Sequence, residues 1–193
     1  NGGAINISID NQVEIIRVWF EDNAADSGGA IYLSALSELD IDDSVFRGNI
    51  AVSQGAAMTL YSPTEIDKST IFENLNFNDA FQETIFVGLD KFGTSSLTIR
   101  NSTIFDNETT GIYAVASDVS IRNTTIANHS EYGILMNPNN NVTPDLRIRN
   151  SIFNQNGTNC TSGLVNRITN NWNITSDNLF CYVISQLQDS TTL

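Results

Sequence analysis

One pattern of apolar and polar positions recurs six times along the chain. It reads apolar-x-Ile-x-x-small-x-apolar-x-x-Asn, and its clearest copies run from Leu39 to Asn49 and from Leu97 to Asn107. The isoleucines of successive copies lie 26, 25, 33, 22 and 27 residues apart. Spacings in this range are typical of solenoid repeats, in which one small unit is stacked many times. The pattern therefore predicts a repeat architecture.

Each copy contains short segments in which apolar and polar residues alternate, as in Leu39–Asp42 and Leu97–Arg100. A period of two indicates a β-strand with one buried face. A second short apolar run follows the Asn and usually opens with glycine, as at Gly28–Ile31 and Gly133–Leu135. Two or three short strands per copy, with no helical periodicity, predict an all-β, right-handed parallel β-helix of about six to seven coils. Its strands pair with the coils above and below.

The last position of the pattern predicts a ladder of stacked side chains at a turn. Amides stacked along the axis satisfy backbone groups that a tight inward turn would otherwise leave unpaired. The only histidine, His129, holds this position in the fifth copy, so we interpret it as a ladder member rather than a catalytic residue. The predicted ladder consists of Asn23, Asn49, Asn74, Asn107, His129 and Asn156.

The pattern degrades near the C-terminus. We expect residues 1–162 to form the coils and residues 163–193 to form a degenerate last coil and a C-terminal cap of the same single domain. A cap covers the unpaired edges at the end of a β-helix. The two cysteines, Cys160 and Cys181, lie in or near this region, and their even number fits one disulfide in an oxidising compartment. Two unpaired buried thiols are the alternative.

Composition narrows the possible partners. The 193 residues are 40% hydrophobic and 16% charged, which argues for a folded chain. The net charge of −13 disfavours nucleic acid, because phosphate binding needs clustered Lys and Arg. No apolar run is long enough to span a membrane, and we expect no cofactor. The abrupt start at Asn1 is interpreted as the edge of a processed or excised piece.

Two motifs carry a resemblance to known proteins. Gly-Gly-Ala-Ile occurs at Gly2–Ile5 and Gly28–Ile31, and Phe-x-x-Asn at Phe20–Asn23, Phe46–Asn49 and Phe153–Asn156. This combination resembles the repeats of polymorphic outer membrane proteins and is similar to other right-handed parallel β-helix surface proteins of bacteria and archaea. The resemblance implies an extracellular, surface-displayed structural or adhesive protein.

The same fold carries pectate lyases and polygalacturonases in other families, so catalysis must be weighed. Hydrolysis of that kind needs paired carboxylic acids with supporting residues. We take the adjacent pair Asp42 and Asp43 as the candidate, and no matching motif accompanies it. We therefore expect no enzyme, and the alternative is a polysaccharide-binding or pectate lyase-like β-helix. Exposed rings that line one cleft would favour it, the candidates being Trp19, Tyr61, Phe92 and Trp172.

The outward positions of the first strand in each copy change charge along the chain. They are acidic in the early copies and basic in the later ones, and the residues are Asp40, Asp42, Glu65, Asp67, Arg100, Arg122, Arg147 and Arg149. One explanation is chance solvation of an exposed sheet. The other is a contact face for self-association or for other surface proteins and glycans, which would build a filament or a sheath-like layer. Asp40, Asp42 and Asp67 are also a weak Ca²⁺ candidate.

Several Asn-x-Ser/Thr sequons suggest glycosylation, although a chain rich in Asn, Ser and Thr generates some by chance. Sequons at Asn107 and Asn156 fall on the predicted inward ladder and should be unavailable. The possible acceptors are Asn6, Asn101, Asn123, Asn128, Asn159 and Asn173. Glycans on them would place the protein on a cell surface.

Overall fold

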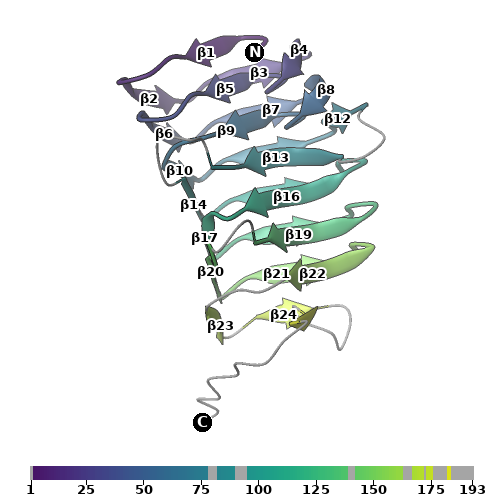
Figure 1. The fold of residues 1–193 in the computed structure, drawn as a ribbon. Helices are drawn as coiled ribbons and strands as arrows, with labels where there is room; N and C mark the ends of the chain where they lie inside the picture. The colour runs from purple at the N-terminus through teal and green to yellow at the C-terminus, as the bar shows by residue number, and fades with distance from the viewer. Residues whose placement is uncertain are drawn as a thin grey trace.

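The computed structural model of the chain is a rod of stacked coils (Figure 1). The structure describes residues 2–77, 82–89, 95–138, 142–162, 167–171, 173–175 and 182–183. These residues form strands, bends and turns, and they contain no helix that is long and apolar enough to span a membrane.

Three long parallel sheets and one short one run along the rod. Sheet A contains β1 (Ile5–Ile7), β5 (Ile31–Leu33), β9 (Met58–Leu60), β13 (Glu83–Val87), β16 (Thr110–Val115), β19 (Tyr132–Asn137), β22 (Thr158–Ser162) and β25 (Tyr182–Val183). Sheet B contains β2 (Gln12–Ile16), β6 (Glu38–Asp42), β10 (Thr64–Asp67), β14 (Ser96–Arg100), β17 (Asp118–Arg122), β20 (Asp145–Arg149) and β23 (Arg167–Asn171). Sheet C contains β3 (Trp19–Glu21), β7 (Val45–Arg47), β11 (Thr70–Phe72), β15 (Thr103–Phe105), β18 (Thr125–Ala127), β21 (Ile152–Asn154) and β24 (Ile174–Thr175). Sheet D contains β4 (Ala24–Ser27), β8 (Ile50–Gln54) and β12 (Leu75–Asn76).

Each coil passes through sheet B and then sheet C before it enters sheet A, and the first three coils also contribute a strand of sheet D. Each strand pairs in parallel with the corresponding strand of the neighbouring coil, as β6 does with β2 and β10. The predicted parallel β-helix is therefore confirmed.

The core is a stack of identical inward positions from the three long sheets. In sheet B, Ile41, Ile66 and Ile99 occupy one register column and are almost fully buried. In sheet C the rings of Phe20 and Phe46 stack with centroids 4.7 Å apart. Burying one such side chain contributes about 1.5–3 kcal/mol to the stability of the fold. The apolar positions of the alternating pattern therefore stabilise each coil.

Residues with positive φ form the corner between sheets B and C. This position has φ from 47° to 56° in every coil that the structure describes there, and its residues are Arg17, Asp43, Lys68, Asn101, Asn123 and Asn150. A left-handed residue other than glycine costs about 1–2 kcal/mol. Hydrogen bonds between coils hold the corner, since the backbone N–H of Asp43 donates to the carbonyl of Asp67 at 3.1 Å. The corner therefore turns the chain in the same way in each coil.

The asparagine column forms the next corner, after sheet C. The side-chain Nδ2 of Asn23 donates to Oδ1 of Asn49 at 2.9 Å, Asn49 donates to Asn74 at 2.9 Å, and Asn74 donates to Asn107 at 3.0 Å. The backbone N–H of each donor residue also bonds to the same oxygen. Because Asn49, Asn74 and Asn107 are at most 1% exposed, these bonds lie inside the rod.

A hydroxyl column at the corner between sheets B and C was not anticipated from the sequence. The backbone N–H groups of Val18, Ser44 and Ser69 donate to the hydroxyls of Ser44, Ser69 and Ser102, each at 3.1 Å. These serines occupy the small position of the repeat, and small size alone does not predict a hydrogen-bonded column. Two polar columns therefore fix the coil register.

The C-terminal segment continues the stack. Strands β23, β24 and β25 extend sheets B, C and A beyond residue 163. Cys160 is 1% exposed in β22, whereas Cys181 lies outside the described residues. The Cys160–Cys181 disulfide and the cap around it therefore stay predictions.

Replacing Asn74 with Ala tests the importance of the asparagine column. The change removes bonds to Asn49, Asn107 and the carbonyl of Phe46, and unpaired buried polar groups cost about 1–3 kcal/mol each. We expect Asn74→Ala to lower the free energy of unfolding by about 3 kcal/mol or more in urea titrations. Asn154→Ala, on the outward face of β21, is the control and should cost less than about 1 kcal/mol. Equal losses in both variants would contradict a special role for the column.

Candidate functional site

The outward face of sheet B carries the clearest candidate site, and its charges are arranged in register. One column runs through Glu14, Asp40, Glu65, Thr98, Ser120 and Arg147. The next runs through Ile16, Asp42, Asp67, Arg100, Arg122 and Arg149. In the second column acid changes to base between β10 and β14, which are adjacent strands. We call these two columns the charged face.

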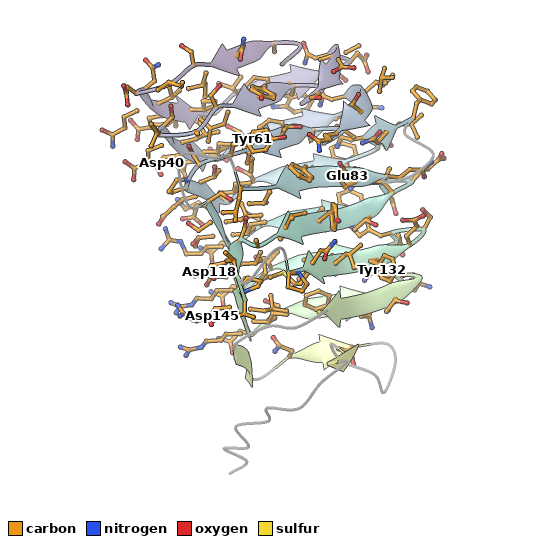
Figure 2. The ribbon with its side chains drawn as sticks, in the orientation of Figure 1. Asp40, Tyr61, Glu83, Asp118, Tyr132 and Asp145 are labelled. Atoms are coloured by element: carbon orange, nitrogen blue, oxygen red, sulfur yellow. The ribbon has the colours of Figure 1, made fainter. Side chains whose placement is uncertain are left out.

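Figure 2 shows this face along one edge of the rod. Asp40 lies toward the N-terminal end, and Asp118 and Asp145 lie further toward the C-terminal end. Near the N-terminal end the face is hollowed to a volume of about 410 Å³. The hollow is lined mainly by carboxylates, from Glu14, Glu38, Asp40, Asp42, Glu65 and Asp67, with Arg100 at its margin.

Ion pairs within the chain neutralise part of the face. Lys68 Nζ lies 2.9 Å from Asp42 and 3.7 Å from Asp67, and its bond to Asp42 raises the pKa of the lysine. Arg100 contacts Glu65 at the boundary between the two halves. These side chains are between 29% and 59% exposed, and ion pairs at the surface add little to stability.

Other charges on the face have no such partner. Within the part of the chain that the structure describes, Glu14 and Asp40 in the acidic half form no ion pair, nor do Arg122 and Arg149 in the basic half. Arg122 and Arg149 are exposed. Unpaired acids therefore remain in one half of the face, and unpaired arginines remain in the other.

The weak Ca²⁺ candidate at Asp40, Asp42 and Asp67 is not supported. Among the described residues no group of three or more His, Cys, Asp or Glu side chains could hold a metal ion. The physical reason is Lys68, whose ammonium lies between Asp42 and Asp67 and supplies the positive charge that these stacked acids require.

The predicted acceptor sequons divide into exposed and buried positions. Asn6, Asn101, Asn123 and Asn128 are exposed. Asn159 is 0% exposed and its side-chain oxygen accepts a bond from Asn156, so its prediction as an accessible acceptor is wrong. Asn173 is half-buried, and its amide donates to the carbonyl of Ile148 at 3.2 Å. Inward-facing side chains at these two corners leave no room for a glycan.

The aromatic rings do not gather in one exposed cleft within the described residues. Trp19 is 67% exposed on sheet C, whereas Tyr61 packs against Tyr32 and Phe86 on sheet A. Phe86 and Tyr113 are each only 6% exposed. Phe92 and Trp172 lie outside the described residues.

Glu83 is a buried acid that the sequence analysis missed. It opens β13, is 1% exposed, and lies on the sheet A side of the rod (Figure 2). Its Oε1 accepts a bond from the backbone N–H of Gly55 at 3.2 Å, whereas Oε2 has no partner among the described residues. Burial, together with the nearby Glu131, raises the pKa of Glu83 to about 8, so the carboxyl is protonated at neutral pH. No repeat position signalled this acid, because it stands at the register position that Ala56 occupies in the preceding coil.

His129 occupies the ladder position, but it continues the ladder only in part. Its backbone N–H donates to Asn156 Oδ1 at 3.1 Å. The imidazole packs against Gly111, where a Cβ atom would lie 2.9 Å from Nε2. Neither ring nitrogen has a hydrogen-bond partner among the described residues. The ladder therefore loses its side-chain bonds at this coil.

A surface hollow of about 550 Å³ lies over this corner. It is lined by Asp106, Asn107, Glu108, Asn128, His129, Ser130 and Gln155. Burial lowers the pKa of His129 to about 4, and nearby backbone carbonyl groups oppose this by raising the pKa. The ring is therefore neutral down to mildly acidic pH.

The lowered pKa of His129 predicts a pH-dependent stability. The folded state binds fewer protons than the unfolded state below pH 6.5, so stability falls as the pH drops from 6.5 toward 4, by up to about 3 kcal/mol. We expect His129→Asn, which can restore the amide ladder, to raise the melting temperature more at pH 5 than at pH 8. Thermal melts of both proteins across this range check the prediction. A difference that does not change with pH would contradict it.

Comparisons with known proteins agree with the geometry of the rod. Neither the curated proteins nor the solved structures include a match to this chain. The family model described as the right handed beta helix region matches residues 3–178, which is most of the chain. The chain therefore belongs to the right-handed β-helix family.

Proposed function

We propose that this chain is a non-catalytic structural or adhesive protein of a cell surface, which contacts neighbouring molecules through the charged face of sheet B. The observation that carries the proposal is the reversal of charge in register along one flat sheet. Asp42 and Asp67 continue directly into Arg100, Arg122 and Arg149 in a single column. Complementary charge patterns guide association and determine the relative position of two partners.

The distribution of basic residues supports the proposal. The chain has only nine Lys and Arg residues against 22 Asp and Glu residues. Four of the nine lie in three consecutive strands of sheet B, namely Arg100, Arg122, Arg147 and Arg149. Solvation alone would be served equally well by acids, which outnumber the basic residues in this chain. A basic cluster on it therefore favours an electrostatic contact.

The polysaccharide-directed alternative has less support. Asp42 ends β6 and Asp43 forms the left-handed corner, so these carboxyls belong to two differently oriented segments. A bound sugar chain also needs rings along one cleft, and Trp19 and Tyr61 belong to different sides of the rod.

A closer relationship to polymorphic outer membrane proteins, and an extracellular location, belong to the same proposal. The Gly-Gly-Ala-Ile and Phe-x-x-Asn motifs support the relationship. The exposed sequons support the location, as would a disulfide between Cys160 and Cys181.

Glycopeptide mapping of protein secreted from a eukaryotic host tests the location. We expect glycans only at exposed sequons such as Asn101 and Asn123, because a buried amide cannot carry one in this fold. A chain without glycans would contradict this part of the proposal. Occupancy at Asn107, Asn156 or Asn159 would contradict the burial on which it depends.

The contact itself is tested by sedimentation velocity over a range of salt concentrations. At about 0.1 M salt the Debye length is about 10 Å, so the general repulsion between two acidic molecules is screened while facing groups still attract. Near 1 M salt the length is about 3 Å and the attraction also weakens. We expect association near 0.1 M salt that is lost near 1 M.

Arg122→Asp should abolish this association. Arg47→Asp, which makes the same change in net charge on the outward face of sheet C, should preserve it. A wild-type protein that is monomeric at every salt concentration would overturn the proposal, as would equal behaviour of the two variants.

A further inference from the structure

The acidic and basic halves of the charged face are complementary to each other, which makes the face complementary to itself. In the second column the order from the N-terminal end is Ile16, Asp42, Asp67, Arg100, Arg122, Arg149. If the same column is reversed and laid opposite, Asp42 faces Arg122 and Asp67 faces Arg100. In the first column Glu14 then faces Arg147. Four of these residues already pair within the chain, namely Asp42 and Asp67 with Lys68, Arg100 with Glu65, and Arg147 with Asp145, so the contacts between copies would extend these ion pairs into networks.

We propose, on the basis of the function proposed above, that the partner of this face is a second copy of the chain, packed antiparallel about a two-fold axis that passes between β10 and β14. A rotation about an axis along the strand direction reverses the rod and keeps each column opposite itself. A two-fold contact of this kind uses the same patch on both copies. Each Asp–Arg and Glu–Arg pair therefore occurs twice.

Other arrangements of the face match less well. Two copies packed in parallel would place Asp42 against Asp42 and Arg122 against Arg122. A polyanion such as an acidic glycan would be attracted to Arg122 and Arg149 but repelled by the acidic half. The edge column beside the charged face, with Glu38 in β6 and Asp118 in β17, is acidic in both halves. It opposes close approach at that margin.

The size of the face indicates the strength of the contact. Strands of about five residues cover about 17 Å, and six strands spaced about 4.8 Å apart cover about 29 Å. Their product is about 500 Å² per copy, below the roughly 800 Å² per partner of a standard stable interface. The contact is therefore weak and reversible in solution, and it gains effective strength where many copies are held at one surface.

The central experiment exchanges the charges of one predicted pair. Arg122→Asp alone and Asp42→Arg alone each create like-charge pairs, so the dissociation constant in sedimentation velocity near 0.1 M salt should rise at least tenfold. The double variant Asp42→Arg/Arg122→Asp exchanges the two charges and should recover association to within a few-fold of wild type.

A second double variant is the matched control. Asp42→Arg/Arg149→Asp makes the same net change on the same face, but Arg149 faces Ile16 in the antiparallel arrangement, so association should not recover. Recovery in the control, or no recovery in the first double variant, would overturn the antiparallel arrangement. The proposed function would survive that result, provided that Arg122→Asp alone abolished association.

Cross-linking keeps the arrangement testable if a charge variant folds poorly. When the roughly 10 Å between two facing sheets is included, the two Thr98 Cα atoms of the two-fold dimer are about 11 Å apart, and the two Ser120 Cα atoms are about 17 Å apart. Thr98→Cys should therefore be cross-linked between copies by a short bifunctional thiol reagent whose reach matches about 11 Å, and Ser120→Cys should not. Efficient cross-linking at Ser120 would overturn the proposal, as would its absence at Thr98.

Discussion

Hydrogen bonds between successive coils determine where the remaining side chains of this protein lie. The backbone pairs each strand with its copy in the next coil, and the buried amides of Asn49, Asn74 and Asn107 hold the chain at the same point of each turn. Because side chains alternate with a period of two, a slip of one residue would turn every core position outward. Register is thus the constraint on which both the core and the surface depend.

The charged face follows from this constraint. Arg100, Arg122 and Arg149 are far apart in the sequence, yet the register places them one above another on β14, β17 and β20. The cost of stacking like charges on neighbouring strands is usually avoided in sheets. In this protein three arginines nevertheless stack over three coils, although the chain has few basic residues. This stacking is the reason to regard the face as a site of contact.

Much of the fold could be predicted from the sequence because the repeat records inward and outward positions directly. Leu39, Ile41 and Asn49 are buried as the pattern requires. The hydroxyl column was missed because Ser44 and Ser69 also fit a simple need for small residues. Glu83 was missed because a single buried acid has no periodic signal, and its environment depends on Gly55 in the preceding coil.

The positions of side chains in the fold also change which candidate sites are plausible. Asn159 and Asn101 have the same sequon, and only the fold shows that one faces inward and the other outward. Likewise, the stacked acids suggested Ca²⁺ until the structure placed the ammonium of Lys68 beside Asp42.

Small-angle X-ray scattering of the whole chain near 0.1 M salt tests the central claim most directly, since it separates the length of a particle from its cross-section. The account predicts that, as concentration rises, the mass and the cross-sectional radius of gyration both increase while the maximum dimension grows by much less than the length of a second rod. Growth in length at constant cross-section, or no growth at all, would contradict it.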